Sequence, residues 1–277
     1  MGRISYRPST EAVAATTAQT ITHADNTLPK GGIKRFFLVN TGANNHLGTT
    51  TPGIDRVNVK MNDDTIYSLP ADHLRILNEA VNASLGGLIT AVDSLRFGIP
   101  FDLYNDGRVG IPRVFRGQGV KASVEQVYNV GNSSLGTSLI GWELLDGEPV
   151  FHPRAISTTT QVAASQTSAR IDLKSGNNLV MGWIIPIVGS TGLTRLKIMR
   201  VNGDGSEDQV FHGTQGIILE SQSHLTPQAL TTTFFFRLPG GPQRFPTGSF
   251  MEVDTGAGSA VGNSYTPVEL IPNALAA

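Results

Sequence analysis

The chain has 277 residues, enough for one large β domain or for two domains that each bury a core. Its 21 Lys and Arg residues against 22 Asp and Glu give a net charge of −1, which argues against a dedicated nucleic-acid-binding protein because no overall positive field would attract phosphates. The lack of cysteine excludes disulfides and thiolate sites, and 31 glycines and 15 prolines with only 16% charged residues are typical of an all-β chain rich in turns.

The first half of the chain is predicted to form a series of strands and one helix. Residues 1–20 are expected to be a flexible arm that carries Arg3 and Arg7. Leu74, Leu77 and Val81 lie at helical spacing and predict a short helix over residues 70–81. Alternation of apolar and polar residues predicts the strands of this half, which are residues 32–40, 54–61, 65–69, 95–103, 119–130 and 138–147.

The second half is predicted to contain a comparable series. Phe234, Phe236 and Leu238 share one face of an aromatic strand, so two of the three consecutive phenylalanines belong to a core and Phe235 is available for a subunit interface. The expected strand regions of this half are residues 177–190, 193–211, which holds a hairpin, 231–241, 248–256 and 264–273.

The two halves repeat one pattern in the same order. IDRVNVKMNDD (54–64) matches LTRLKIMRVNGD (193–204), so that Arg56 corresponds to Arg195 and Val57 to Leu196. Near the end of each half, Glu143-Leu144-Leu145 matches Glu269-Leu270-Ile271. The repeat predicts a duplicated β domain, with a first domain over 21–152, a Thr- and Ser-rich linker over 153–170 and a second domain over 171–277. The alternative is that strand–turn–strand patterns resemble one another in any β protein.

The expected fold class is all-β, with two consecutive eight-stranded jelly-roll sandwiches and one or more short helices. A jelly roll arranges eight short antiparallel strands in two packed sheets, which protects the unpaired edges of the sheets. Immunoglobulin-like sandwiches are the competing architecture, although the Cys…Trp…Cys pattern common among them is impossible here.

Two such domains, the paired hairpins, the helix-forming PADHLRILNEAV (70–81) and the amino-terminal arm resemble the double jelly-roll major capsid proteins of tailless icosahedral bacteriophages. The similar families are the corticovirus-, finnlakevirus- and autolykivirus-like phages of the adenovirus-type lineage. The resemblance implies a structural virion protein without enzymatic activity that forms pseudo-hexameric homotrimers in an icosahedral capsid. It also implies contacts with neighbouring capsomers and with penton or minor capsid proteins, and places the arm with Arg3 and Arg7 near an internal viral membrane.

Catalytic, cofactor-binding and metal-binding residues are not expected. The six histidines, His23, His46, His73, His152, His212 and His224, lack any metal-ligand spacing, and GxSxG and phosphate-loop motifs are absent. Asp204, Glu207 and Asp208 resemble a fragment of a calcium loop but are interpreted as a solvated hairpin turn. Glu143 and Glu269 are interpreted as equivalent strand positions of two domains and not as a catalytic pair.

Two other functions stay open. A tandem carbohydrate-binding, lectin-like module would use exposed aromatic side chains, but Trp142 and Trp183 both fall inside strand segments. A cupin-type enzyme would need clustered His and Glu ligands, which the sequence does not display. No apolar run approaches the ~18 residues of a membrane-spanning helix, so the sequence predicts a soluble protein.

Overall fold

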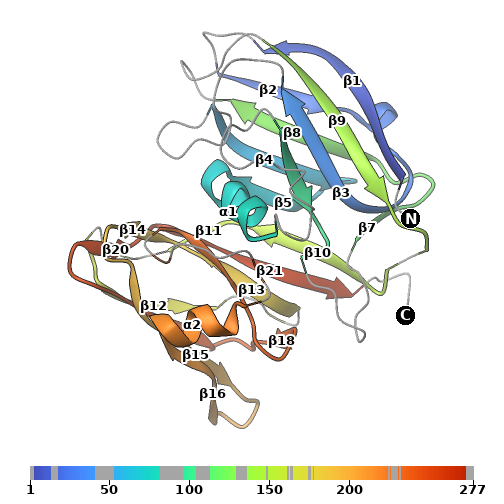
Figure 1. The fold of residues 1–277 in the computed structure, drawn as a ribbon. Helices are drawn as coiled ribbons and strands as arrows, with labels where there is room; N and C mark the ends of the chain where they lie inside the picture. Colours follow the sequence, from blue (N-terminus) through green and yellow to red (C-terminus); the bar gives the residue numbers. More distant parts are fainter. Residues whose placement is uncertain are drawn as a thin grey trace. The chain divides into compact units, whose positions relative to one another are not determined.

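The computed structural model describes residues 3–13, 18–40, 53–81, 96–103, 113–128, 136–147, 149–160, 162, 165–173, 176, 178–223, 225, 230 and 232–272. These residues form mostly strands, together with two α-helices and one short 3-10 helix, η1 (Asp25–Thr27) (Figure 1). None of the described helices is long and apolar enough to span a membrane. The chain divides into two compact units, of which the first comprises Met1–Ile156 together with Ile271–Ala277 and the second comprises Ser157–Leu270.

The first unit contains two antiparallel sheets. One has the strand order β1-β9-β3-β6, with β7 also paired to β3, and the other has the order β2-β8-β4-β5, with β10 parallel to β5. The strands are β1 (Arg3–Val13), β2 (Gln19–His23), β3 (Gly31–Asn40), β4 (Ile54–Met61), β5 (Asp64–Pro70), β6 (Arg96–Pro100), β7 (Val114–Arg116), β8 (Ala122–Tyr128), β9 (Gly136–Leu144) and β10 (Phe151–Ile156).

The core of the first unit follows from the alternation of its strands. In β8 every second side chain is buried, because successive residues of a strand point to opposite faces. Phe101 packs edge-on against Phe36 of β3 and Tyr67 of β5, with ring centroids 5.8 and 4.9 Å apart, and so joins side chains from both sheets. The helix α1 (Ala71–Val81) is fixed beside β6, since the Asn78 side chain exchanges hydrogen bonds of 2.7 and 2.8 Å with the backbone of Gly98.

The second unit also contains two principal antiparallel sheets. Their orders are β11-β21-β13-β17, with β18 also paired to β13, and β12-β19-β15-β16, and a short pair joins β14 to β20. The strands are β11 (Thr158–Thr159), β12 (Ser168–Asp172), β13 (Leu179–Ile185), β14 (Ile187–Gly189), β15 (Leu193–Val201), β16 (Glu207–Thr214), β17 (Phe234–Arg237), β18 (Gln243–Arg244), β19 (Phe250–Thr255), β20 (Ser259–Val261) and β21 (Ser264–Pro272).

The core of the second unit draws on both sheets. Trp183 of β13 stacks edge-on against Phe245 at 5.1 Å between ring centroids, and Leu196 and Ile198 of β15 belong to the same buried cluster. The helix α2 (Gln215–Ser221) contributes Ile218 to this cluster. The cluster therefore fills the space between the two sheets, as in other sandwiches.

The two units share one topology. If the eight principal strands of each unit are numbered in chain order, both units have sheets with the orders 1-8-3-6 and 2-7-4-5, and both place a helix between the fifth and sixth strands. This order is that of a jelly roll. The prediction of two consecutive eight-stranded jelly-roll sandwiches with short helices is confirmed.

The repeat noticed in the sequence corresponds to equivalent strands. Arg56 and Arg195 are each the third residue of the fourth strand, β4 or β15, and the residues that follow them, Val57 and Leu196, are both buried. The matched turns join β4 to β5 and β15 to β16. The matched Glu-Leu pairs lie on the eighth strands, β9 and β21.

Two segments and one side chain differ from expectation. The predicted flexible arm over 1–20 is wrong for residues 3–13, because they form β1 and pair with β9, whose edge would otherwise be open. The predicted linker over 153–170 holds most of β10, all of β11 and the start of β12, since Thr is compatible with strands wherever the backbone finds a partner. Phe235, which the sequence left available for a subunit interface, is fully buried within the chain.

Candidate functional site

The histidines are distributed over separate elements. His23 lies on β2, His73 on α1, His152 on β10 and His212 on β16, while His46 and His224 lie outside the described residues. Within the described residues, no group of three His, Asp or Glu side chains is arranged to hold a metal ion. The described histidines therefore offer no shared ligand set of the kind that a cupin metal centre needs.

Two of the three acidic residues predicted at the β15–β16 hairpin, Asp204 and Asp208, form hydrogen bonds within the hairpin. Asp204 Oδ1 accepts hydrogen bonds from the Ser206 backbone N–H at 2.9 Å and its hydroxyl at 2.6 Å, which lower the pKa of Asp204. Arg200 donates to Asp208 at 2.8 Å and lowers the pKa of this carboxyl as well. The turn is therefore closed by Ser206 and Arg200, and its carboxylates act as turn-forming groups.

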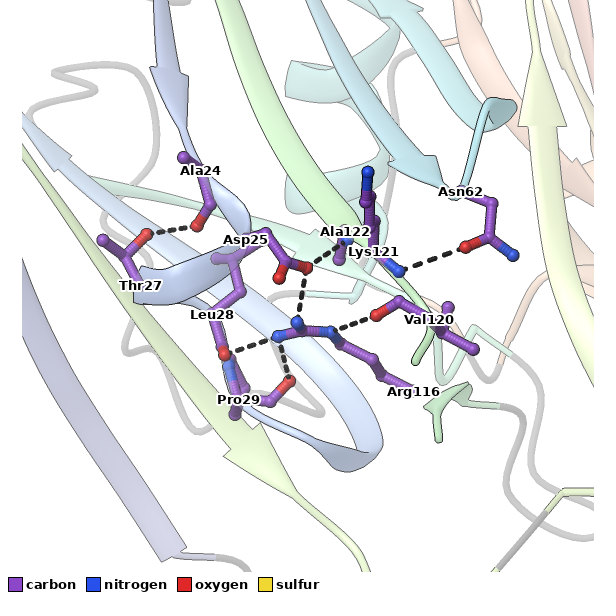
Figure 2. Close-up of polar contacts among 10 residues, drawn as sticks. All are labelled: Ala24, Asp25, Thr27, Leu28, Pro29, Asn62, Arg116, Val120, Lys121 and Ala122. Atoms are coloured by element: carbon purple, nitrogen blue, oxygen red, sulfur yellow. Dashed lines mark hydrogen bonds and ion pairs between the residues drawn. The ribbon is translucent and has the colours of Figure 1, made fainter. Parts of the chain in front are cut away.

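The corresponding turn of the first unit has a different role. Asn62 adopts a left-handed conformation with φ of 53°, which Asn tolerates better than most residues. Its backbone N–H donates to Lys121 O at 2.7 Å, and its side-chain oxygen accepts from the Lys121 N–H at 3.1 Å (Figure 2). Asn62 thus ties the hairpin to the segment that precedes β8, a contact that the sequence did not indicate.

Arg116 is the centre of a second group of contacts near this turn, shown in Figure 2. Its guanidinium donates to the carbonyl oxygens of Leu28 at 2.6 Å, Pro29 at 3.2 Å and Val120 at 2.9 Å. It also pairs with the Asp25 carboxylate, which accepts the Ala122 N–H at 2.8 Å. Because Arg116 is only 3% exposed, this network holds η1, β7 and the start of β8 together from inside the unit. The clue in the sequence is an arginine that shares a strand face with Val114.

Four charged side chains form a largely buried cluster at β3 and β9, which belong to the same sheet as β7. Lys34 Nζ lies 3.0 Å from Glu143 Oε1 and 3.5 Å from Asp102 Oδ2. Arg35 Nε lies 3.1 Å from Glu143 Oε2, and the Arg35 guanidinium also pairs with Asp102. Two cations and two carboxylates balance, so Glu143 is a structural ion-pair partner. Its counterpart in the second unit, Glu269, is 5% exposed.

A polar network crosses the core of the first unit. Gln126 Nε2 donates to Ser138 Oγ at 2.6 Å and lies 3.1 Å from His23 Nε2, which is itself 3.2 Å from Ser138 Oγ. The Tyr128 hydroxyl donates to Gln126 Oε1 at 3.2 Å. Since β2 and β8 belong to one sheet and β9 to the other, these hydrogen bonds join the two layers. Burial lowers the pKa of His23 to about 4 and raises that of the Tyr128 phenol.

The remaining buried histidine of the described residues, His73, and the two tryptophans lie in the interior of the protein. Burial lowers the pKa of His73 more than the nearby Asp72 raises it, so this imidazole is held neutral within the first unit. Both tryptophans of the chain are buried, Trp142 at 6% and Trp183 at 1% exposure. Neither forms the exposed aromatic platform that the lectin-like hypothesis requires.

No family model matches the sequence, and no curated protein matches it. Among solved structures, the STIV major capsid protein aligns with a TM-score of 0.66 and 12% identity over 97% of this chain and 96% of its own. The fold is a double jelly roll.

Two further solved structures have the same fold. The major capsid protein of bacteriophage PM2 aligns with a TM-score of 0.62 and 11% identity over 98% of this chain and 97% of its own. The PBCV-1 virus capsid aligns with a TM-score of 0.59 and 10% identity over 98% of this chain and 93% of its own. These matches extend over nearly the whole length of both chains, so the protein shares both jelly rolls with them.

Proposed function

We propose that this protein is a major capsid protein, that it forms homotrimers and that it builds the icosahedral shell of a virion. The observation that carries the proposal is the agreement over whole chains with major capsid proteins of two different viruses, at 96 to 97% of their lengths. An enzyme or binding module that shared one sandwich with these proteins would match only part of them.

The identical strand order of the two units gives this assembly a physical basis. Three copies of a chain with two similarly shaped units place six jelly rolls around one axis, so a threefold trimer has a nearly sixfold outline. The net charge of −1 lets many copies pack side by side without strong mutual repulsion. On this proposal, the domains expected over 21–152 and 171–277 are two copies of one ancestral jelly roll. The first copy also includes β1, and the second also includes β11 and the start of β12.

The finer assignment is to a tailless bacteriophage with an internal membrane, of the corticovirus-, finnlakevirus- or autolykivirus-like kind. The protein would be located in the capsid and would contact neighbouring capsomers and penton or minor capsid proteins, without enzymatic activity. Arg3 and Arg7 lie on β1 and pair in register with Leu144 and Ile140. A membrane contact would therefore be made by a strand of the first unit, and not by a free arm.

The helix α2 supplies a contact surface for the trimer. Ile217 is 50% exposed and Leu219 is 45% exposed, on the two flanks of a helix that buries only Ile218. The helix at the same topological place in the first unit, α1, buries its large apolar residues, including Leu74 and Leu77. Burying the flanks of α2 against a second copy would remove this apolar surface from water.

Light scattering coupled to size-exclusion chromatography tests the proposal. A trimer has a mass of about 88 kDa for chains of 29.5 kDa, and negative-stain images should show particles with a six-sided outline. The variant Ile217→Ser/Leu219→Ser should shift the protein toward monomer, whereas Val188→Ser, which removes a 63% exposed side chain elsewhere in the unit, should not. A wild-type protein that stays monomeric at tens of micromolar, and forms no six-sided particles, would contradict the proposal and agree with a binding module.

A further inference from the structure

A pocket opens between the first two strands of the second unit. Its volume is about 310 Å³, and its walls come from β11 and β12, which are the edge strands of the two sheets. In the described part of this unit no further strand is added to either edge. It is lined by Thr158, Thr159, Thr160, Val162, Arg170, Ile171, Asp172 and Tyr265.

Hydrogen bonds made by two of the lining residues, Thr160 and Tyr265, hold the walls of the pocket in place. Thr160 donates through its hydroxyl to Gly262 O at 2.8 Å and is 7% exposed. The Tyr265 hydroxyl donates to the backbone oxygen of Asp172 at 3.0 Å and so links β21 to β12 across the floor. The pocket is therefore a preformed feature of the sandwich, of the size at which small-ligand sites begin, roughly 300 Å³.

Arg170 is held in position by contacts that leave its two terminal nitrogens, Nη1 and Nη2, without a partner among the described residues. Its guanidinium carbon lies 3.6 Å from the centroid of the Phe250 ring, and its Nε lies 3.5 Å from Asp172 Oδ1. Stacking of this kind orients the planar guanidinium. No hydrogen bond from Arg170 Nη1 or Nη2 to another described residue is present, so both nitrogens can donate to a ligand.

The hydroxyl groups of Thr158 and Thr159 are available as well. Neither makes a side-chain hydrogen bond within the described residues, and Thr159 is exposed. Each hydroxyl can donate one hydrogen bond and accept two. The pocket therefore presents guanidinium donors, carboxylate acceptors and groups that do both, together with the partly buried Val162.

The charges in this set select against simple ions. Asp172 would repel a phosphate or sulfate at Arg170, and Arg170 would repel a cation at Asp172. We propose that the pocket binds a neutral saccharide. Vicinal sugar hydroxyls accept from Arg170 while donating to Asp172, the threonine hydroxyls bind a further ring oxygen or hydroxyl, and the C–H face of the ring packs on Val162. A capsid subunit with such a site would attach to carbohydrate on a host surface, which goes beyond its role in the shell.

Saturation-transfer difference NMR on the full-length protein tests the proposal with glucose, galactose, mannose, N-acetylglucosamine and lactose as probes. At least one probe should receive saturation from the wild-type protein. Its affinity should fall at least tenfold in Arg170→Met and in Asp172→Asn, and severalfold in Thr159→Val, which keeps the shape of the side chain. Arg244→Met is the matched control, because Arg244 is an exposed arginine of the same unit outside the pocket, and it should bind as the wild type does.

Thermal unfolding of each variant separates loss of the site from loss of the fold, and Thr159→Val gives a reading even if Arg170→Met unfolds. The proposal is overturned if none of the probes binds, or if binding is unchanged in the folded Arg170→Met and Thr159→Val proteins. It is also overturned if only N-acetylneuraminic acid binds and does so more tightly in Asp172→Asn, which would indicate an anion site. Displacement of every sugar by an extended threonine-rich peptide, with tighter binding of that peptide, would assign the groove to a protein segment instead. Since the measurement needs only the folded chain, its outcome is independent of trimer formation.

Discussion

His23 should make the first jelly roll sensitive to acid. The side chain is 1% exposed, its Nδ1 atom has no hydrogen-bond partner within the described residues, and burial lowers its pKa from 6.5 to about 4. Above pH 6.5 both the folded and the unfolded chain carry neutral His23, and stability does not depend on it. Between pH 6.5 and 4, His23 is protonated in the unfolded chain but neutral in the folded chain, so the free energy of unfolding falls as the pH falls.

The size of this effect follows from the two pKa values. A lowering from 6.5 to about 4 corresponds to about 3 kcal/mol in full, at 1.36 kcal/mol for each pKa unit, and about 2.5 kcal/mol of it is already lost at pH 4.5. The variant His23→Gln keeps a polar group near Ser138 but cannot take up a proton. We expect the wild type to lose about 2.5 kcal/mol more than this variant between pH 7.5 and 4.5.

Urea unfolding can measure this difference for the first unit alone. The chain has one tryptophan in each unit, so in a Trp183→Phe background the fluorescence of Trp142 reports on the first jelly roll. The exposed His212 supplies the control, and His212→Gln should have the pH dependence of the wild type. The contribution of the buried His73 is common to all three proteins and cancels. Equal loss of stability in the wild type and in His23→Gln would refute the reasoning.

Three further predictions concern packing and strand pairing. Gly182→Ala should destabilise the second unit by about 2 kcal/mol or more, because the added Cβ would lie 2.1 Å from a backbone oxygen of β17. In the control Gly203→Ala the added Cβ has no other heavy atom within 4 Å, so the midpoint of thermal unfolding should not change. Arg116→Met should lower the free energy of unfolding of the first unit in urea by about 3 to 5 kcal/mol, because it leaves a carboxylate and three carbonyl oxygens without their donor. The control Arg244→Met removes an exposed arginine and should lower the free energy of unfolding by less than about 0.5 kcal/mol. Similar losses in the two variants would contradict the network of Figure 2. Deletion of residues 3–13 removes an edge strand and should cause aggregation in light scattering; a stable, monodisperse product would show that β1 is dispensable.

Much of the architecture could be predicted from the sequence because the pattern that specifies it is local. Period-two alternation around Val57 and Leu196, followed by turn residues, indicates a strand and hairpin without any knowledge of the partner strands. The same property sets the limit of the prediction. Residues 3–13 and 158–159 have few apolar side chains, and only their pairing with β9 and β21, far along the chain, makes them strands.

The candidate sites were less predictable, since they depend on which residues meet across the sheets. Gln126 and Ser138 are polar residues of predicted strands to which the sequence assigned no role, and the structure places both in the core beside His23. The pocket at Arg170 and Asp172 falls in a region predicted to be the end of a linker, so nothing in the sequence marked it as a site. The hairpin carboxylate Asp204, by contrast, was interpreted correctly as part of a turn, because an Asx turn is a local structure.

The pairing of the first strand of each jelly roll with its last strand has a consequence for synthesis. Arg3 pairs with Leu144 and Thr158 with Tyr265, so neither unit completes this sheet until its eighth strand has left the ribosome. Closing such long loops slows folding, and a nascent chain that stalls before residue 136 presents β3 without the neighbour that should cover it. Production of this chain in high yield therefore depends on translation reaching the end of each jelly roll before incomplete chains aggregate.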